Sequence, residues 1–361
     1  MLIDEHLRQL KAYQPGKPIE EVRRTLGLKK IYKLASNEIP FAPQHIKKLV
    51  LEELKKINLY PEADCFYLRK ALQKKFKVKS EQIVLGNGSD EIIGLTLKAF
   101  VKENNEVIVG YPTFLIYEMQ AKIFRAKAKR IPFKNYRYDL DTIAKNISKD
   151  TKIIFIANPD NPTGTYLTHQ EMESFFNKIP QDILVYLDEA YYEFAPKRDF
   201  PRSLSFLKKR GNIIFSRTFS KAYGLAGLRV GYGVTTSEIG EILNKVREPF
   251  NVNRLAQVAA CVSLENKSFL KEVISYINKE KDYLYQQLHR LGISFIKSAT
   301  NFILIDFKRD SKKLYHYLLK RGVIVRELSS WGLEGFLRVT IGEHKANQAF
   351  IQGIENYLRG K

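Results

Sequence analysis

Three groups of polar residues follow short apolar runs in this sequence, and each group holds side chains that could do chemistry. They are residues 158–164 (Asn-Pro-Asp-Asn-Pro-Thr-Gly), residues 188–191 (Asp-Glu-Ala-Tyr) and residues 216–221 (Ser-Arg-Thr-Phe-Ser-Lys). Lys221 precedes a segment with four glycines, residues 222–233, which lets backbone approach a ligand closely. A lysine there can form an imine with an aldehyde if its surroundings favour the neutral amine. Taken alone, a lysine after a serine is more often a surface charge.

Asp188 follows the apolar run 183–187, so it is expected at the end of a buried strand, where an unpaired carboxylate would be costly. A protonated pyridine nitrogen would supply the cation and would keep such a ring an effective electron sink. An aspartate that caps the next helix is the alternative. Asn161 and Tyr191 are suited to hydrogen-bond an oxygen of the same ring, although Asn-Pro-Thr-Gly could also be a simple turn.

Residues 86–90 (Gly-Asn-Gly-Ser-Asp) lie between a predicted strand and a predicted helix, so their free amides form an expected anion site. Thr218, Ser220 and Arg229 could complete a cradle for a phosphate group. A dinucleotide-binding motif is not matched, because its sixth position is Glu91, and the Walker pattern is absent. Class A β-lactamase chemistry would need a serine where Thr218 stands.

The elements that must position these groups alternate between short β-branched runs and segments of helical periodicity. This alternation predicts a mostly parallel α/β sheet, because parallel neighbours need a crossover connection. The carboxyl ends of such strands face the crevice where ligands bind. The predicted strands are residues 82–85, 106–109, 152–157, 183–187 and 212–216, and the predicted helices between them are 91–101, 114–124 and 168–177.

The last third of the chain has a different pattern, which predicts a separate α+β unit. Residues 255–290 are helical in character, and strands at 293–307 and 336–341 flank a helix at 311–321. The first forty or so residues contain too many prolines to form a core alone, so they are expected to pack on this unit. We expect an N-terminal arm at 1–48, a large ligand-binding domain at 49–265 and a small C-terminal domain at 266–361.

Bulk composition excludes several classes of protein. The formal charge of +21 invites a nucleic-acid function, but the basic residues are spread in short groups along the whole chain, which favours a solvated surface. No apolar run is long enough for a membrane span, and the N-terminus lacks a signal-peptide core. Cys65 and Cys261 have no partner at metal-ligand spacing, so no metal site is expected and a cytoplasmic location is favoured.

Further segments give a more specific resemblance. They are residues 12–22 (Ala-Tyr-Gln-Pro-Gly-Lys-Pro-Ile-Glu-Glu-Val), 33–38 (Lys-Leu-Ala-Ser-Asn-Glu), 59–62 (Leu-Tyr-Pro-Glu) and 249–253 (Pro-Phe-Asn-Val-Asn). Together with the three polar groups, they resemble the class I/II aminotransferases. These are pyridoxal-5′-phosphate (PLP) enzymes of fold type I, and the likeness within them is to the histidinol-phosphate aminotransferases. The resemblance covers nearly the whole chain and implies a seven-stranded, mostly parallel sheet.

The resemblance implies a role for each matching residue. Lys221 would form the Schiff base with PLP and shuttle a proton, Asp188 would pair with the pyridine nitrogen, and Asn161 and Tyr191 would hold the ring hydroxyl. Phe114 would stack on the ring, although tyrosine is more frequent there. The cofactor phosphate would be bound by Gly88, Ser89, Asp90, Thr218, Ser220, Arg229 and, from the second subunit of a homodimer, Tyr60. The segment 39–43 also departs from the family pattern, which affects the shape of that loop.

Arg326 and Arg338 are predicted on strands of the C-terminal unit, where an arginine that points to solvent is the simpler alternative. An enzyme of this type must bind glutamate and imidazole-acetol phosphate in turn, giving 2-oxoglutarate and L-histidinol phosphate. A guanidinium group can hold either anion, so we predict that Arg338 alternates between them, helped by Arg326, Tyr13 and Asn37. An aromatic amino-acid or other phospho-ketone aminotransferase, and a PLP-dependent decarboxylase of a phosphorylated amino acid, remain alternatives.

Overall fold

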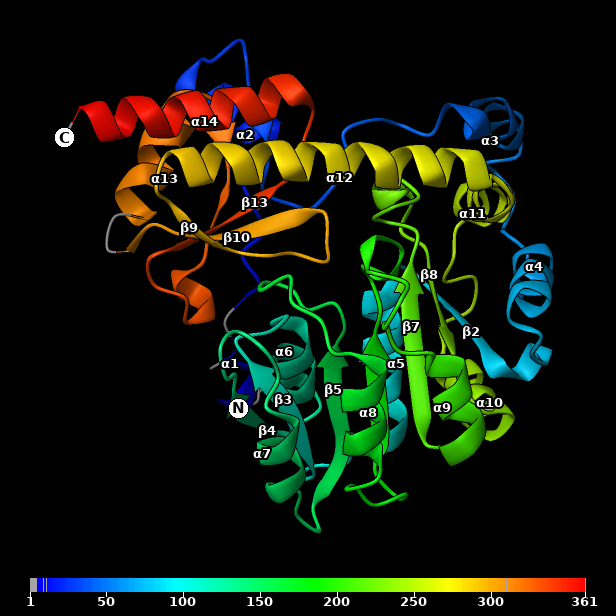
Figure 1. The fold of residues 1–361 in the computed structure, drawn as a ribbon. Coiled ribbons are helices and arrows are strands. Elements are labelled where there is room, and N and C mark those ends of the chain that lie inside the picture. The colour runs from blue at the N-terminus through cyan, green and yellow to red at the C-terminus, as the bar shows by residue number, and fades with distance from the viewer. Residues whose placement is uncertain (1–4, 9, 11, 309–310, 361) are drawn as a thin grey trace.

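The computed structural model describes residues 5–8, 10, 12–308 and 311–360, and its centre is one large sheet. Six strands of this sheet run in the same direction, and only β8 runs antiparallel to its two neighbours. Figure 1 shows the sheet in the lower half of the molecule. Its spatial order is β2 (Ile83–Gly86), β8 (Gly231–Val234), β7 (Ile213–Thr218), β6 (Leu184–Asp188), β5 (Thr151–Ala157), β3 (Glu106–Tyr111) and β4 (Lys127–Pro132).

Strand register aligns the ends that carry the polar groups. Ala157 at the end of β5 pairs with Asp188 at the end of β6, and Asp188 pairs with Ser216 on β7. Gly231 at the start of β8 pairs with both Thr218 and Gly86. The carboxyl ends of the parallel strands therefore meet at one edge of the sheet.

Both faces of the sheet are apolar and covered by helices. Val185 and Leu187 of β6 contribute to one core, and Leu184 and Tyr186 contribute to the other, as the two-residue period of a strand requires. The first core includes residues of α4 (Phe66–Phe76), α8 (His169–Phe176), α9 (Ser203–Arg210) and α11 (Arg254–Glu265). The second includes residues of α5 (Ser89–Phe100), α6 (Ile116–Ile123) and α10 (Ser237–Val246). The short helix α7 (Leu140–Lys145) packs beside α8.

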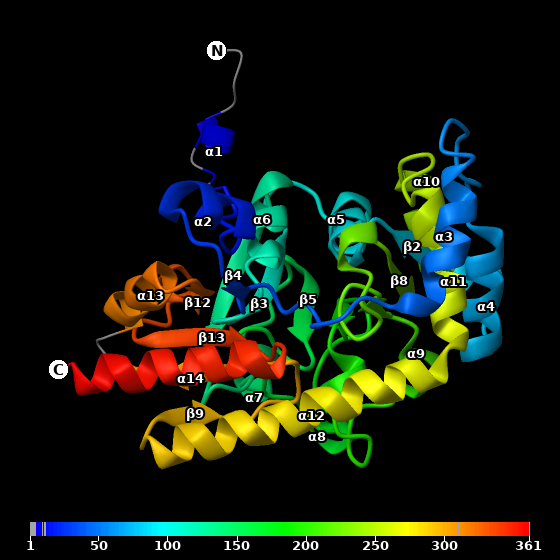
Figure 2. The same ribbon diagram turned by 90° about the horizontal axis from the view of Figure 1, so that it is seen from above.

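The C-terminal unit is built on an antiparallel sheet in the order β12 (Arg326–Glu327), β13 (Phe336–Thr340), β10 (Phe302–Asp306) and β9 (Ser294–Ile296). Its core also takes residues of α12 (Lys267–Arg290), α13 (Ser311–Lys320) and α14 (His344–Arg359). Viewed from above, α12 lies beside α14 and continues to α11 (Figure 2). Residue 266 lies between α11 and α12, and we propose it as the start of the small domain.

The N-terminal segment packs on the C-terminal unit. β1 (Tyr32–Lys33) pairs in parallel with β11 (Val323–Ile324), and Val22 of α2 (Ile19–Leu26) shares a small core with Ile324. The remaining N-terminal helices are α1 (Glu5–Arg8) and α3 (Lys47–Leu54). No helix in the described part of the chain is long and apolar enough to cross a membrane.

Several expected element boundaries differ from the structure. Two strands of the large sheet, β4 and β8, were not expected from the sequence, and residues 293–307 were expected as one extended run where a turn separates β9 from β10. The helical stretch 255–290 is broken at Asn266, whose side chain accepts a hydrogen bond from the amide of Phe269 and so begins a new helix.

Candidate active site

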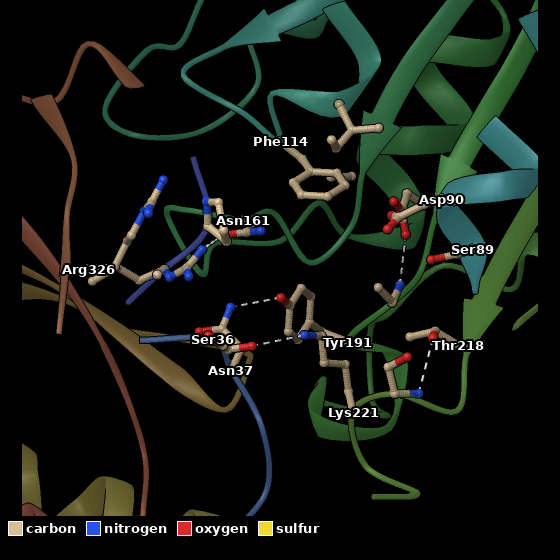
Figure 3. A pocket seen from close by; sticks show the side chains of 18 of the residues that line it. Ser36, Asn37, Ser89, Asp90, Phe114, Asn161, Tyr191, Thr218, Lys221 and Arg326 are labelled. Atoms are coloured by element: carbon tan, nitrogen blue, oxygen red, sulfur yellow. Dashed lines mark hydrogen bonds between the residues drawn. The ribbon is translucent and has the colours of Figure 1, made fainter. Parts of the chain in front are cut away.

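A cavity of about 320 Å³ opens between the strand ends of the large sheet and the C-terminal unit. Its size suits a small-molecule ligand. Figure 3 shows that its side chains come from segments far apart in the sequence. Fourteen of the sixteen predicted site residues line it: Tyr13, Asn37, Ser89, Asp90, Phe114, Asn161, Asp188, Tyr191, Thr218, Ser220, Lys221, Arg229, Arg326 and Arg338. The other two are Gly88, which lies next to the lining residue Arg229, and Tyr60, and neither of them lines the cavity.

Lys221 follows β7, and its side chain reaches into the cavity. Its Nζ donates to the carbonyl oxygen of Ser36 at 3.3 Å and lies 5.7 Å from the ring centroid of Tyr191. The pKa of Lys221 is lowered to about 8. Burial is the largest cause, and the positive charge of Arg338 is the second. A substantial fraction of neutral amine is therefore present near neutral pH, as attack on an aldehyde requires.

Asp188 is buried at the end of β6, with 5% of its surface exposed. Its Oδ2 accepts a hydrogen bond from the hydroxyl of Tyr117 at 2.7 Å, and its Oδ1 accepts one from the amide of Ala190 at 3.0 Å. Burial raises the pKa of Asp188 to about 6, and among the described residues its carboxylate accepts hydrogen bonds from neutral groups, the Tyr117 hydroxyl and the Ala190 amide. The carboxylate lines the cavity but lacks a positive partner, so a cation from a ligand would fit it.

Asn161 and Tyr191 line the same cavity as Lys221, and each is held by a neighbour (Figure 3). The hydroxyl of Tyr191 accepts from Nδ2 of Asn37 at 2.9 Å, and Oδ1 of Asn161 accepts from Nη1 of Arg338 at 2.5 Å. The Oδ1 atom of Asn37 accepts from the hydroxyl of Thr340 at 3.1 Å. In this structure Asn37 therefore orients Tyr191, whereas its predicted contact with substrate stays a prediction.

The expected anion site lies at the start of α5. Gly88 is the N-cap residue and has φ +79° and ψ 171°, a conformation that is nearly exclusive to glycine. A Cβ atom on Gly88 would meet Nη2 of Arg229 at 2.5 Å, and one on Gly231 would meet the amide nitrogen of Ser89 at 2.5 Å. The absence of a side chain at both glycines therefore lets Arg229 and β8 approach the first amides of α5 closely.

The other members of this cradle converge on the same point. Nη1 of Arg229 donates to the hydroxyl of Ser220 at 3.2 Å, and Nη2 lies 3.6 Å from the carboxylate of Asp90. The amide of Ser220 donates to the hydroxyl of Thr218 at 3.1 Å. A cation, two hydroxyl groups and a helix N-terminus in one place make a site that can hold a phosphate dianion.

Phe114 precedes α6 and borders the cavity across from Tyr191 (Figure 3). Its ring packs edge-on against Tyr117, with centroids 5.6 Å apart, and lies 6.5 Å from the ring of Trp331. The ring is thus fixed by aromatic neighbours on its outer side and is available to a planar ligand on the other.

Arg338 is buried on β13 and faces the cavity, so the alternative of a solvent-facing arginine is wrong for this residue. Besides its bond to Asn161, its Nη2 donates to the carbonyl oxygen of Ala35 at 2.8 Å, and its Nε has no hydrogen-bond partner within the described part of the chain. Arg326 is paired with Arg338 across β12 and β13 and donates to the carbonyl oxygen of Gln14 at 2.6 Å. Its guanidinium lies 6.0 Å from the ring centroid of Tyr13.

Tyr60 lies away from the cavity of its own chain. Its side chain is 78% exposed and its ring stacks on Phe250 at 4.7 Å. The role that the resemblance implies for Tyr60 requires a second subunit, so it stays a prediction.

The sequence reasoning missed Tyr117, which lines the cavity and contacts Asp188. The available signal was its spacing of three residues from Phe114, which places both rings on one side of a helical turn. A tyrosine in an apolar helix is more often core, so the spacing alone was not specific.

The residues present fit PLP. Asp188 offers a buried negative charge to a pyridinium nitrogen, Lys221 offers an amine to the aldehyde, and the cradle around Arg229 offers donors to the phosphate.

The chain matches the family described as aminotransferase class I and II over residues 29–354. A histidinol-phosphate aminotransferase from Moorella thermoacetica is 43% identical over 356 residues, which cover 98% of this chain and 92% of that protein. The crystal structure of histidinol-phosphate aminotransferase from Sinorhizobium meliloti, in complex with pyridoxal-5′-phosphate, has a TM-score of 0.88 at 24% identity and covers 99% of this chain and 98% of that chain.

A second structural neighbour is L-threonine-O-3-phosphate decarboxylase from Porphyromonas gingivalis. It has a TM-score of 0.81 at 26% identity and covers 91% of this chain and 100% of that chain. These likenesses confirm the expected α/β fold of the PLP enzymes of fold type I. Since the family match spans most of the sequence and the Moorella relative covers nearly all of it, this chain belongs to the class I and II aminotransferases.

Proposed function

We propose that this protein is a PLP-dependent histidinol-phosphate transaminase. It moves the amino group between glutamate and imidazole-acetol phosphate, and the products are 2-oxoglutarate and L-histidinol phosphate. The observation that carries the proposal is that a buried arginine, Arg338, faces the same cavity as the reactive amine of Lys221. The name of the Moorella relative supports this choice of substrate.

Bound PLP supplies a pyridine ring that accepts the electron pair left when a proton leaves the substrate α-carbon. Asp188 would hold positive charge at the ring nitrogen, because its hydrogen-bond donors among the described residues are both neutral. Oδ1 of Asn161 is taken by Arg338, so its amide nitrogen is the atom that can donate to the ring oxygen, beside the hydroxyl of Tyr191.

Lys221 moves the proton in both half-reactions. A pKa near 8 lets its neutral amine take the proton from the substrate α-carbon. It also lets the resulting ammonium donate that proton to the carbon atom that is protonated next. The carbonyl oxygen of Ser36, which accepts from Nζ, holds the amine in the cavity between these transfers.

Arg338 binds the anionic group that both substrates carry. Its bonds to Asn161 and Ala35 fix the plane of the guanidinium group, and its unpartnered Nε shows that donor capacity remains. A buried cation without a carboxylate partner is costly, so a substrate carboxylate or phosphate stabilises it. Arg326 and Tyr13 line the same cavity and can extend this contact to the larger, phosphorylated substrate.

The test is a set of single half-reactions. The purified holoprotein is mixed with L-histidinol phosphate, glutamate, phenylalanine or a small amino-alcohol phosphate, and the absorbance of the lysine-bound cofactor is followed. Rapid loss of that band with glutamate and with L-histidinol phosphate supports the proposal. A fast reaction with phenylalanine and none with L-histidinol phosphate would assign an aromatic aminotransferase instead. Release of CO₂ would indicate a decarboxylase.

We also propose a homodimer in which Tyr60 reaches the cofactor phosphate of the partner. Six large apolar side chains within residues 51–67 are exposed, which supports it: Leu51, Ile57, Leu59, Tyr60, Phe66 and Tyr67. Large apolar side chains that are exposed in one segment are typical of a protein interface.

Hybrid dimers test this arrangement. Lys221→Ala and Tyr60→Ala subunits are each impaired, but a dimer that contains one of each has one intact site if Tyr60 acts across the interface. Random mixing should restore about a quarter of the wild-type sites. No recovery on mixing, with dimers present in light scattering, would place Tyr60 outside the partner's site.

We propose a cytoplasmic location. Cys65 and Cys261 are both free thiols, the state that a reducing compartment maintains. Cell fractionation should recover the protein with the cytosol.

A further inference from the structure

Tyr117 is a buried aromatic residue that neither the sequence motifs nor the proposed mechanism uses. It lies on α6, and its side chain is inaccessible to water. Its ring stacks on Phe155 of β5, with centroids 5.0 Å apart and planes 10° apart, and packs edge-on against Phe114. These contacts fix the ring, so the direction of its hydroxyl group is fixed as well.

The hydroxyl of Tyr117 points at Asp188 and donates to Oδ2 at 2.7 Å. Burial and the nearby negative charge of Asp188 raise the pKa of Tyr117 well above its ordinary value, so the hydroxyl keeps its proton and acts as the donor. Among the described residues, the one other hydrogen bond to this carboxylate comes from the backbone amide of Ala190. Each carboxylate oxygen therefore has one fixed donor.

The charged groups around Asp188 work against its ionised form. Asp90 at the start of α5 and Glu189, the next residue after β6, are both acidic and raise the pKa of Asp188 in addition to burial. The side-chain bond from Tyr117 and the backbone bond from Ala190 lower it, and the contribution of Tyr117 is the larger of the two. A hydrogen bond to the charged form favours that form.

We propose that Tyr117 is a positioning residue for the reaction: its hydroxyl holds Asp188 ionised and correctly oriented, and so keeps the proton on the cofactor's ring nitrogen. The inference rests on the proposed function, because it needs a pyridine ring next to Asp188. Without the hydroxyl, Asp188 would compete more strongly for the proton that it shares with the ring nitrogen. A neutral ring is a weaker electron sink in both half-reactions.

Tyr117→Phe is the direct test, because phenylalanine keeps the ring that packs on Phe155 and removes only the hydroxyl. The variant and the wild type are loaded with PLP labelled with ¹⁵N at the ring nitrogen, and the ¹⁵N chemical shift is measured. The wild type should show the shift of a protonated ring, and the variant should move toward that of neutral pyridine. The kcat of both half-reactions should fall on the order of tenfold with little change in KM.

Tyr186→Phe is a matched control. Tyr186 is fully buried on β6 and packs against the same Phe155 ring at 5.3 Å, but its hydroxyl makes no hydrogen bond with Asp188. This variant should keep the wild-type ¹⁵N shift and kcat. In an Asp188→Asn background, adding Tyr117→Phe should produce no further change, because the charge that the hydroxyl supports is already gone.

An unchanged ¹⁵N shift and kcat in a folded Tyr117→Phe protein would overturn the inference and leave the proposed function intact. A wild-type protein that binds no PLP would overturn the proposed function itself. If the phenylalanine variant does not fold, 3-fluorotyrosine at position 117 keeps the ring and makes its hydroxyl a stronger donor. The pH at which the ring nitrogen loses its proton should then rise, and an unchanged value would also overturn the inference.

Discussion

Attachment of PLP to the cofactor-free protein should depend on pH in a way that the surroundings of Lys221 determine. Only the neutral amine attacks the aldehyde. Burial is the main cause that lowers the pKa of Lys221 to about 8, and the positive charge of Arg338 is the second. A lowered pKa means that the neutral form appears at lower pH than in an ordinary lysine.

The size of this effect follows from the two pKa values. With a pKa of about 8, about a tenth of the amine is neutral at pH 7, against about 0.03% for an ordinary lysine, so the reactive fraction is roughly 300-fold larger. The attachment rate should rise about tenfold per pH unit below pH 8 and level off above it. Arg338→Met removes a positive charge from beside the amine, so the midpoint should move to higher pH.

Stopped-flow absorbance measures this directly when cofactor-free protein is mixed with pyridoxal, which lacks the phosphate and so reports mainly on the amine. Arg326→Met is the matched control, because Arg326 lines the same cavity but is not one of the charges with the largest effect on the pKa of Lys221. Its midpoint should equal that of the wild type. A wild-type midpoint near 10.5, or an Arg338→Met midpoint that does not move, would refute the electrostatic reasoning.

Three further substitutions test other parts of the site. Asp188→Asn removes the negative charge opposite the ring nitrogen, so kcat should fall about a hundredfold or more; a folded variant with wild-type kcat would contradict the assigned role. Arg338→Met should raise the KM for glutamate and for imidazole-acetol phosphate by roughly 10- to 100-fold, because a hydrogen bond to a charged group contributes about 1.5–3 kcal/mol. An unchanged KM for both substrates would show that Arg338 does not bind them. Gly88→Ala should lower the free energy of unfolding by about 1–3 kcal/mol because of its backbone angles, and should weaken PLP binding by displacing Arg229. Gly227→Ala, where an added Cβ meets nothing within 4 Å, is its control in thermal unfolding and PLP titration, and equal losses in both variants would contradict the argument.

The strands that carry the polar groups could be predicted because each is a short apolar run that ends at a polar residue. β5, β6 and β7 are buried on both faces, so they lack alternation and stand out in the sequence. β4 was missed because it is an edge strand with lysine and arginine on it, and these residues mask its apolar signal. β8 was missed because two of its four residues are glycines, which are weak strand formers.

The cofactor side of the candidate site could be predicted better than the substrate side. Asp188 ends the buried strand β6, and Lys221 comes three residues after the buried strand β7. Because these strands are parallel neighbours, both side chains lie at the same edge of the sheet. The direction of Arg338 could not be derived, because it depends on how the C-terminal unit packs over the large sheet. The contact between Tyr117 and Asp188 joins a helix to a strand end 71 residues away, and no local pattern encodes it.

The central claim is that the amine of Lys221 becomes covalently joined to PLP inside this cavity. Borohydride reduction of the holoprotein fixes that bond, and peptide mass spectrometry then locates the added mass. We expect one label per chain, on the peptide that contains Lys221, and none in Lys221→Ala. A label on another lysine, or none in the wild type, would contradict it.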